Sequence, residues 1–155
     1  SDADPENKEY YMSNLESYKK EINDLTGYIV RRINEIPESK RVLITAHDAF
    51  GYFAKQFGME VKSIQGISTD SEAGTKDISE LADFIVKREI KAVFIESSVP
   101  RKTIESLQEA VKARGWEVKI GGELYSDSLG DKEHDTDTYI KTVKKNVDVI
   151  TEALK

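Results

Sequence analysis

From residue 41 onward the sequence alternates short apolar runs with segments of helical periodicity, and this alternation restricts the fold more than any other feature. The apolar runs span 41–46, 59–64, 91–97 and 116–120, and the helical segments span 49–57, 76–88, 102–114 and 138–154. Consecutive strands that are joined by helices lie parallel, because each helix crosses back over the sheet. The sequence therefore predicts an α/β fold, with a four-stranded mainly parallel sheet and helices on both of its faces.

Ahead of this pattern, residues 1–38 are predicted to form one long helix. Apolar residues recur at spacings of three and four along it, at Tyr11, Leu15, Tyr18, Ile22, Leu25, Ile29 and Ile33. Asp4 and Pro5 are typical of a helix start, and Pro37 prevents the helix from continuing. A helix of about 32 residues extends about 48 Å, beyond the ~35–40 Å diameter of a domain of this size. Part of its apolar side is therefore expected to project and to pack on a partner.

Composition and charge exclude several classes of function. The 155 residues carry a net charge of −6 without a basic stripe, which argues against nucleic acid as a partner. The absence of cysteine excludes disulfides, thiolate zinc sites and cysteine nucleophiles. No apolar run approaches the ~20 residues that span a bilayer, so we expect a soluble chain with one α/β domain.

Three side chains that can bind metal are predicted at one edge of the sheet. His47 follows the first strand, Glu96 ends the third, and Asp127 comes a few residues after the fourth. The carboxyl ends of parallel strands share one edge, where α/β proteins bind ligands. Imidazole and carboxylate together suit zinc, manganese or iron. The spacing also fits a plainer interpretation, in which Asp127 or Asp48 caps a helix or anchors a loop.

The residues alone also leave a second functional class open, an enzyme on the same fold. In this alternative, Glu96 and Asp127 act as the acid and base of a hydrolase. No G-x-S-x-G nucleophile motif supports it. The second histidine, His134, lies among charged residues and is expected to be exposed and without a role.

Four segments, taken together in order and spacing, resemble the C-terminal lobe of a known family. They are VLITAHDAFGYFAKQFG (42–58), IQGISTDSEAG (64–74), AVFIESSVP (92–100) and IGGELYSDSLG (120–130). The family comprises the TroA-like or ZnuA-like metal-binding solute-binding proteins of ABC transporters. Its members have two lobes that are bridged by a long rigid helix, and one zinc or manganese ion is held between the lobes.

The resemblance implies a role for each candidate residue. Residues 1–38 match the bridging helix, and 39–155 match the C-terminal lobe, so the N-terminal lobe is expected to be absent from this chain. His47 and Asp127 match the metal ligands of this lobe, and we expect Glu96 to orient His47 from behind. The two other ligands of the family, histidines of the N-terminal lobe, have no match here. The lone lobe is therefore expected to be metal-free or to bind metal weakly.

The resemblance also implies partners, a metal and a location. The expected function is delivery of a divalent metal ion to a membrane permease, without catalysis, in the periplasm or on the outer face of the cell membrane. Zinc is favoured over manganese or iron, because many manganese-selective members have glutamate at the position of His47. A homodimer through the long helix is a further hypothesis, since a two-fold axis would bring two histidines and two aspartates together.

Overall fold

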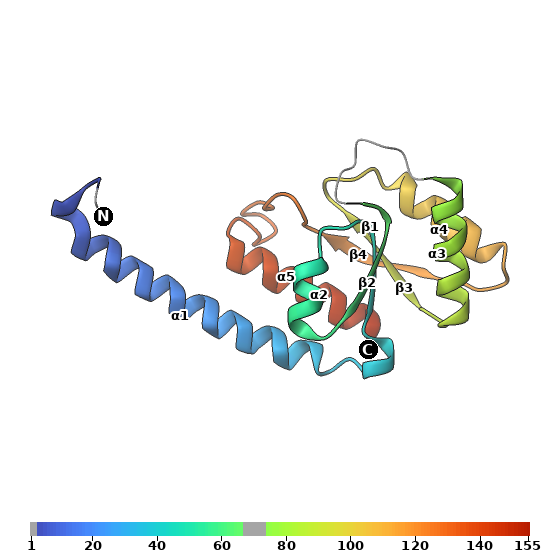
Figure 1. The fold of residues 1–155 in the computed structure, drawn as a ribbon, viewed down its shortest axis with the longest axis horizontal. Helices are drawn as coiled ribbons and strands as arrows, with labels where there is room; N and C mark the ends of the chain where they lie inside the picture. Colours follow the sequence, from blue (N-terminus) through green and yellow to red (C-terminus); the bar gives the residue numbers. More distant parts are fainter. Residues whose placement is uncertain (1–2, 67–73) are drawn as a thin grey trace.

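The computed structural model describes residues 3–66 and 74–155, so most of the 64–74 segment lies outside the described residues. In chain order the elements are a 3-10 turn at Pro5–Asn7, α1 (Lys8–Ile33), a 3-10 turn at Glu38–Lys40, β1 (Val42–His47), α2 (Gly51–Phe57), β2 (Glu60–Gln65), α3 (Thr75–Lys87), β3 (Ala92–Glu96), α4 (Lys102–Lys112), β4 (Lys119–Leu124) and α5 (Tyr139–Leu154). Figure 1 shows an α/β body at one end of the molecule and α1 extending away from it. None of the helices in the described part is long and apolar enough to cross a membrane.

The predicted α/β fold with parallel strands is confirmed, and the strands form two hydrogen-bonded pairs. β1 pairs with β2 and β3 pairs with β4, both in parallel. β1 and β3 lie against each other between the two pairs, but no ladder of backbone hydrogen bonds joins them in the described residues. At the carboxyl end of this seam, the Glu96 carboxylate accepts the backbone N–H groups of Ala46 and His47, each at 2.9 Å. A side chain thus takes donors that a neighbouring strand would take in a continuous sheet.

Helices cover both faces of the strands, as predicted. One buried cluster joins α3 and α4 to one face, and a second joins α1, α2 and α5 to the other. Alternate residues of β1 supply both clusters, since Val42 and Ile44 belong to the first and Leu43 to the second. Every residue of β1 is buried, as expected for a strand in the middle of such a layer.

β4 begins later than the predicted strand at 116–120. Trp116 lies before the strand, where its indole N–H donates to the carbonyl oxygen of Ile90. The strand contains Gly121 and Gly122, which give no apolar signal in the sequence. A Cβ atom on Gly121 would lie 2.7 Å from Cβ of Ala153, and one on Gly122 would lie 2.5 Å from Cγ1 of Val149. Glycine therefore lets the backbone of β4 approach α5 closely.

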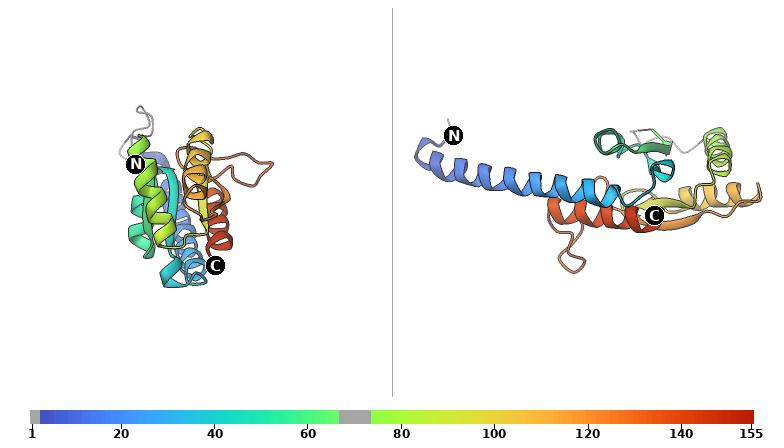
Figure 2. Two further views of the ribbon diagram at one scale, coloured as in Figure 1. Left: turned by 90° about the vertical axis from the view of Figure 1, so that its right-hand side faces the viewer. Right: turned by 90° about the horizontal axis from the view of Figure 1, so that it is seen from below.

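The long N-terminal helix is confirmed, but α1 has 26 residues and starts at Lys8. Asp4 is the N-cap residue of the 3-10 turn before α1, with Pro5 as the first residue of that turn, and its carboxylate accepts from the side chains of Asn7 and Tyr11. The C-terminal half of α1 buries Leu25 and Ile29, whereas the N-terminal half projects beyond the rest of the chain (Figure 2).

Polar contacts fix the direction in which α1 leaves the body. The guanidinium of Arg32 contacts Asp148 and Glu152 of α5, both at 2.8 Å, and Glu35 at 2.7 Å. One turn earlier, the Tyr28 hydroxyl donates to the same Asp148 carboxylate at 2.5 Å. The last turns of α1 are thus anchored on α5 by both apolar packing and charge.

Candidate metal centre

His47 is the last residue of β1 and lies between two carboxylates. It is only 3 % exposed, and the buried strand before it fixes its backbone. Its Nδ1 lies 2.7 Å from Oε2 of Glu96, and its Nε2 lies 3.2 Å from Oδ2 of Asp127. The structure thus brings together the three side chains that the sequence placed at one edge.

Glu96 ends β3 and is wholly enclosed, with a side chain that is 0 % exposed. Its Oε1 accepts the N–H groups of Ala46 and His47, and its Oε2 and the Nδ1 of His47 have no other polar partner among the described residues. A buried carboxylate needs such partners, because an unpaired one is costly to take out of water. The 2.7 Å approach places Glu96 on the Nδ1 side of the ring and leaves Nε2 on the side of Asp127.

Asp127 approaches the other nitrogen of the ring from the loop that follows β4. Its side chain is 55 % exposed, so its carboxylate faces both His47 and solvent. In tetrahedral zinc sites, nitrogen and oxygen ligands at ~2.0–2.2 Å from the metal lie about 3.3–3.5 Å from each other. The 3.2 Å between Nε2 and Oδ2 is close to this separation. The pair therefore fits two adjacent ligands of one metal ion.

Two ligands make only part of a coordination shell. Within residues 3–66 and 74–155 no group of three or more metal-ligating side chains converges on one point. Glu96 does not complete a set, because it occupies the Nδ1 side of the ring while Asp127 faces Nε2. Zinc sites usually have three or four protein ligands, so further ligands must come from outside this pair.

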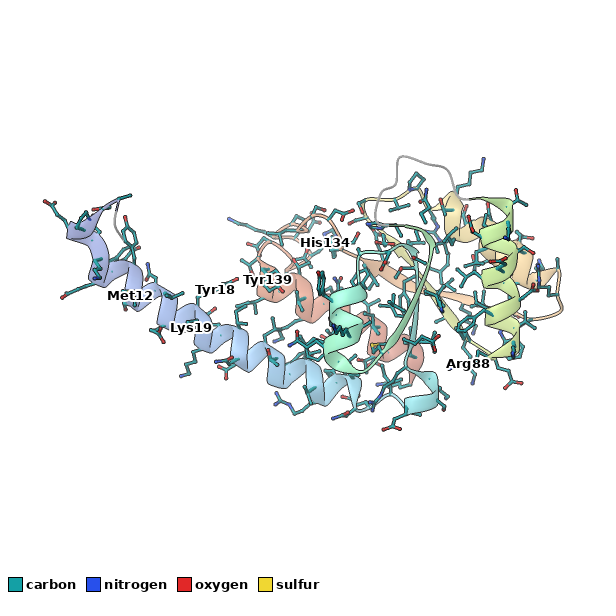
Figure 3. The ribbon with its side chains drawn as sticks, in the orientation of Figure 1. Met12, Tyr18, Lys19, Arg88, His134 and Tyr139 are labelled. Carbon is teal, nitrogen blue, oxygen red and sulfur yellow. The ribbon has the colours of Figure 1, made fainter. Side chains whose placement is uncertain are left out.

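The remaining candidates lie apart from this chemistry. The His134 side chain, labelled in Figure 3, is 62 % exposed. Its Nδ1 lies 2.8 Å from Oδ1 of Asp131. The backbone N–H and then the side chain of His134 lower the pKa of Asp131. Asp48 makes no capping hydrogen bond to α2, whose N-cap residue is Phe50, so the expected capping role of Asp48 is wrong.

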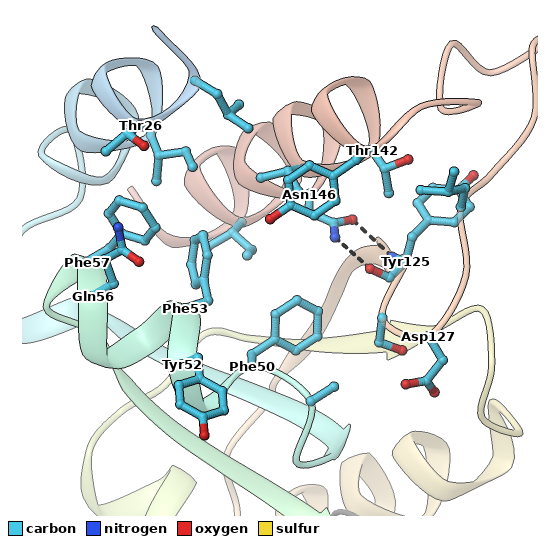
Figure 4. Close-up of a pocket in the computed structure, with 18 of the residues that line it drawn as sticks. Thr26, Phe50, Tyr52, Phe53, Gln56, Phe57, Tyr125, Asp127, Thr142 and Asn146 are labelled. Atoms are coloured by element: carbon cyan, nitrogen blue, oxygen red, sulfur yellow. Dashed lines mark hydrogen bonds between the residues drawn. The ribbon is translucent and has the colours of Figure 1, made fainter. Parts of the chain in front are cut away.

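An apolar groove opens beside Asp127. It has a volume of about 530 Å³ and runs between α1, α2, α5 and the start of the loop after β4. Aromatic side chains dominate its α2 wall, with Phe50, Phe53 and Phe57, as the close-up in Figure 4 shows. The Asp127 carboxylate thus lies at the border between a polar pair and an apolar surface.

Asn146 of α5 is a residue of this region that the sequence did not bring to notice. It is buried, and its side-chain amide both accepts from and donates to the backbone of Tyr125 (Figure 4). The available signal was a polar residue at a helical position between Thr142 and Ile150, where periodicity favours an apolar side chain.

Comparisons with known proteins place this geometry in context. The model of the family described as zinc-uptake complex component A, periplasmic (ZnuA), matches residues 1–153. The zinc-binding protein TroA of Treponema pallidum is 47 % identical over 144 residues, which are 93 % of this chain and 47 % of that protein. The manganese-binding lipoprotein MntA of Bacillus subtilis is 44 % identical over 155 residues, which are 100 % of this chain and 51 % of that protein.

A solved structure agrees with the sequence comparisons. The periplasmic zinc-binding protein TroA from Treponema pallidum superposes with a TM-score of 0.94 and 46 % identity, over 97 % of this chain and 54 % of that one. The chain spans about half the length of the curated relatives that it matches. Because the family model covers nearly all of its residues, the chain belongs to the ZnuA family.

Proposed function

We propose that this chain is the metal-binding C-terminal lobe of the substrate-binding component of an ABC transporter for a divalent transition metal. The observation that carries the proposal is the 3.2 Å approach of His47 Nε2 to Asp127 Oδ2 at the carboxyl edge of the strands. The names of the relatives support it, since one is a zinc-binding and another a manganese-binding protein. The metal ion is here a cargo that is bound and released, and no catalysis is involved.

Zinc is the proposed cargo, with manganese or iron as alternatives. The lobe supplies one imidazole nitrogen and one carboxylate oxygen, and nitrogen ligands favour zinc over manganese at equal availability. Both metals occur in the names of the relatives, so the donor set rather than the likeness supports zinc.

The rest of the site belongs to a second lobe in this proposal. In it, residues 1–38 are the bridging segment that contains α1, 39–155 are the C-terminal lobe, and an N-terminal lobe supplies the missing ligands. The exposed apolar side chains on the projecting half of α1 support this arrangement, namely Tyr10, Tyr11, Met12, Leu15 and Tyr18. Figure 3 labels Met12 and Tyr18 on that half of the helix, well away from the body. An apolar stripe of this size on a projecting helix needs cover from another part of the protein.

The proposed location and second partner follow from the family. TroA is described as periplasmic and MntA as a lipoprotein, so we place the complete protein in the periplasm or on the outer face of the cell membrane. There it would pass its ion to the membrane permease of the transporter.

The hydrolase alternative has little support from the geometry. Glu96 would have to reach a substrate, but its side chain is enclosed and its Oε1 already accepts two backbone N–H groups. Asp127 alone leaves an acid–base pair incomplete.

The proposal is tested by calorimetry of the complete two-lobed protein with zinc and with manganese, for the unaltered protein and for His47→Ala and Asp127→Ala. Each substitution removes one of two ligands, and we expect it to weaken zinc binding about 100-fold or more. His134→Ala is the matched control, because it removes the other histidine from an exposed loop. Unchanged zinc binding in His47→Ala, with the fold intact by circular dichroism, would refute the proposal.

A further inference from the structure

The loop between β4 and α5 carries Asp127 and is held by polar groups that are unusual on a helix face. α5 packs on the body through Val147, Ile150 and Leu154, with Thr151 also buried on this helix. On the same side it buries Thr142 and Asn146, which are four residues apart and so lie one above the other. Both side chains bond to the loop and not to the helix itself.

The side-chain amide of Asn146 forms two hydrogen bonds with the start of the loop, one through its oxygen and one through its nitrogen. Its Oδ1 accepts the N–H of Tyr125 at 3.0 Å, and its Nδ2 donates to the carbonyl oxygen of Tyr125 at 2.7 Å. This pair of bonds fixes the backbone of Tyr125 as a neighbouring strand would. Asp127 lies only two residues further along.

Thr142 forms a hydrogen bond with the other end of the loop. Its hydroxyl donates to the carbonyl oxygen of Thr136 at 2.7 Å. The backbone of Thr136 in turn bonds to Gly130 at 2.9 Å and to Asp131 at 2.8 Å, which closes the loop on itself. A Cβ atom on Gly130 would collide with the Thr136 hydroxyl, so glycine is needed at this crossing. The short segment that contains Asp127 is therefore fixed on both sides.

We propose that Asn146 and Thr142 are positioning residues that hold the 125–136 loop so that the Asp127 carboxylate faces Nε2 of His47. Neither side chain touches the imidazole–carboxylate pair, and both act through the loop backbone. The role in metal affinity rests on the proposed function, whereas the role in placing Asp127 does not.

The test compares two variants that keep the shape of the side chain but remove its hydrogen bonds, Asn146→Leu and Thr142→Val. We expect Asn146→Leu to speed hydrogen exchange of the Tyr125 amide on the order of tenfold, because its acceptor is lost. In both variants, we expect a weaker proton–proton Overhauser contact between the His47 ring and the β-protons of Asp127. Zinc affinity of the same variants is expected to fall about tenfold.

Val111→Ala on α4 is the control for general destabilisation. Val111 is fully buried in the cluster on the opposite face of the strands, so its truncation lowers stability without touching the loop. We expect the control to keep the contact between His47 and Asp127 and to keep the zinc affinity of the folded protein. If Asn146→Leu does not fold, Asn146→Asp replaces it in the same measurements, together with Thr142→Val. Aspartate keeps the acceptor for the Tyr125 N–H but loses the donor to the Tyr125 carbonyl oxygen.

The outcomes separate this proposal from the proposed function. Unchanged exchange at Tyr125 and an unchanged contact between His47 and Asp127 in the loop variants would overturn the positioning role. A loss of the contact in Val111→Ala of equal size would also overturn it, because the effect would then follow stability alone. If the complete two-lobed protein binds no divalent transition metal, the proposed function fails, while the exchange and contact measurements on this chain still decide the role of Asn146 and Thr142.

Discussion

The Glu96 carboxylate touches two backbone N–H groups and one imidazole nitrogen where β1 and β3 end side by side. This arrangement joins two tasks in one side chain. It satisfies the donors of Ala46 and His47 at the seam, and it lies beside Nδ1, from where it was expected to orient the His47 ring. The sequence predicted the second task from the family resemblance, but the first depends on the spacing of two strands that are far apart along the chain.

Replacing Glu96 by glutamine is expected to separate these tasks. The amide oxygen of Glu96→Gln can still accept from Ala46 and His47, but its NH₂ group then faces Nδ1 of the ring. The ring proton moves to Nε2, the atom that faces Asp127, and zinc affinity is expected to fall about 10–100-fold with little loss of stability. Calorimetry with zinc and thermal unfolding measure the two effects. Glu123→Gln, at an exposed residue of the neighbouring strand, is the matched control, and equal affinity in both variants would contradict the prediction.

At the scale of helices and strands, the contact between α1 and α5 combines packing with a charged cluster. Burial is the largest cause that raises the pKa of Tyr28, and its hydrogen bond to Asp148 raises the pKa further. The hydrogen bonds that Arg32 donates to Glu152 and then to Glu35 raise the pKa of Arg32, so the cluster keeps its cation throughout the accessible pH range. The neutral Tyr28 hydroxyl is thus the group of this contact that responds to alkali.

The pH dependence of this contact follows from the sign of the Tyr28 shift. A pKa that folding raises contributes stability that is fully present below pH 10.0, the ordinary tyrosine value, and is lost as the pH rises through the folded-state pKa. We expect the unaltered chain to lose stability above pH 10 relative to Tyr28→Phe, because ionised Tyr28 would face the Asp148 carboxylate. Urea unfolding of both proteins from pH 8 to pH 11 measures the difference. Parallel curves for the two proteins would refute this assignment.

Among the helices and strands, some features were predictable from the sequence and others were not. β1 was predictable because every residue of it is buried and four of its six residues are apolar. The predicted bounds of β4 were too early in the sequence, because Gly121 and Gly122 carry no apolar pattern. Glycine is required at both positions by the close approach of α5. The bonds from Asn146 to Tyr125 could not be predicted, because they join α5 to a loop whose path is set by tertiary packing.

At the scale of the whole molecule, the chain is a body with a projecting helix whose outer half has no cover. This feature was predictable from the length of the expected helix, since about 48 Å exceeds the ~35–40 Å diameter of a domain of this size. His47 and Asp127 were predictable as neighbours because strand ends share an edge. The groove of about 530 Å³ beside them was not, because it depends on the relative positions of three helices and a loop.

The uncovered helix leads to a prediction about assembly. We expect the lone chain to form a homodimer through the outer half of α1, and we expect zinc to strengthen the dimer by joining two half-sites. Sedimentation velocity with and without zinc measures this. Leu15→Glu places a charge in the stripe and should yield a monomer, whereas Lys19→Glu on the same helix is the control for added negative charge. A monomer in both conditions for the unaltered chain would exclude the dimer.

α1 is fixed to α5 at Tyr28 and Arg32, near its C-terminal end, whereas its N-terminal end is held by no comparable contact in the described residues. The 26 residues of α1 correspond to about 39 Å, so a tilt of about 10° at the fixed end would swing the far tip by about 7 Å. Metal–ligand bonds tolerate errors of only about 0.2 Å. A metal ligand whose position depends on α1 could therefore share an ion with His47 and Asp127 only if the angle between α1 and α5 varies by much less than 10°. The contacts of Arg32 with Asp148 and Glu152 would have to hold that angle.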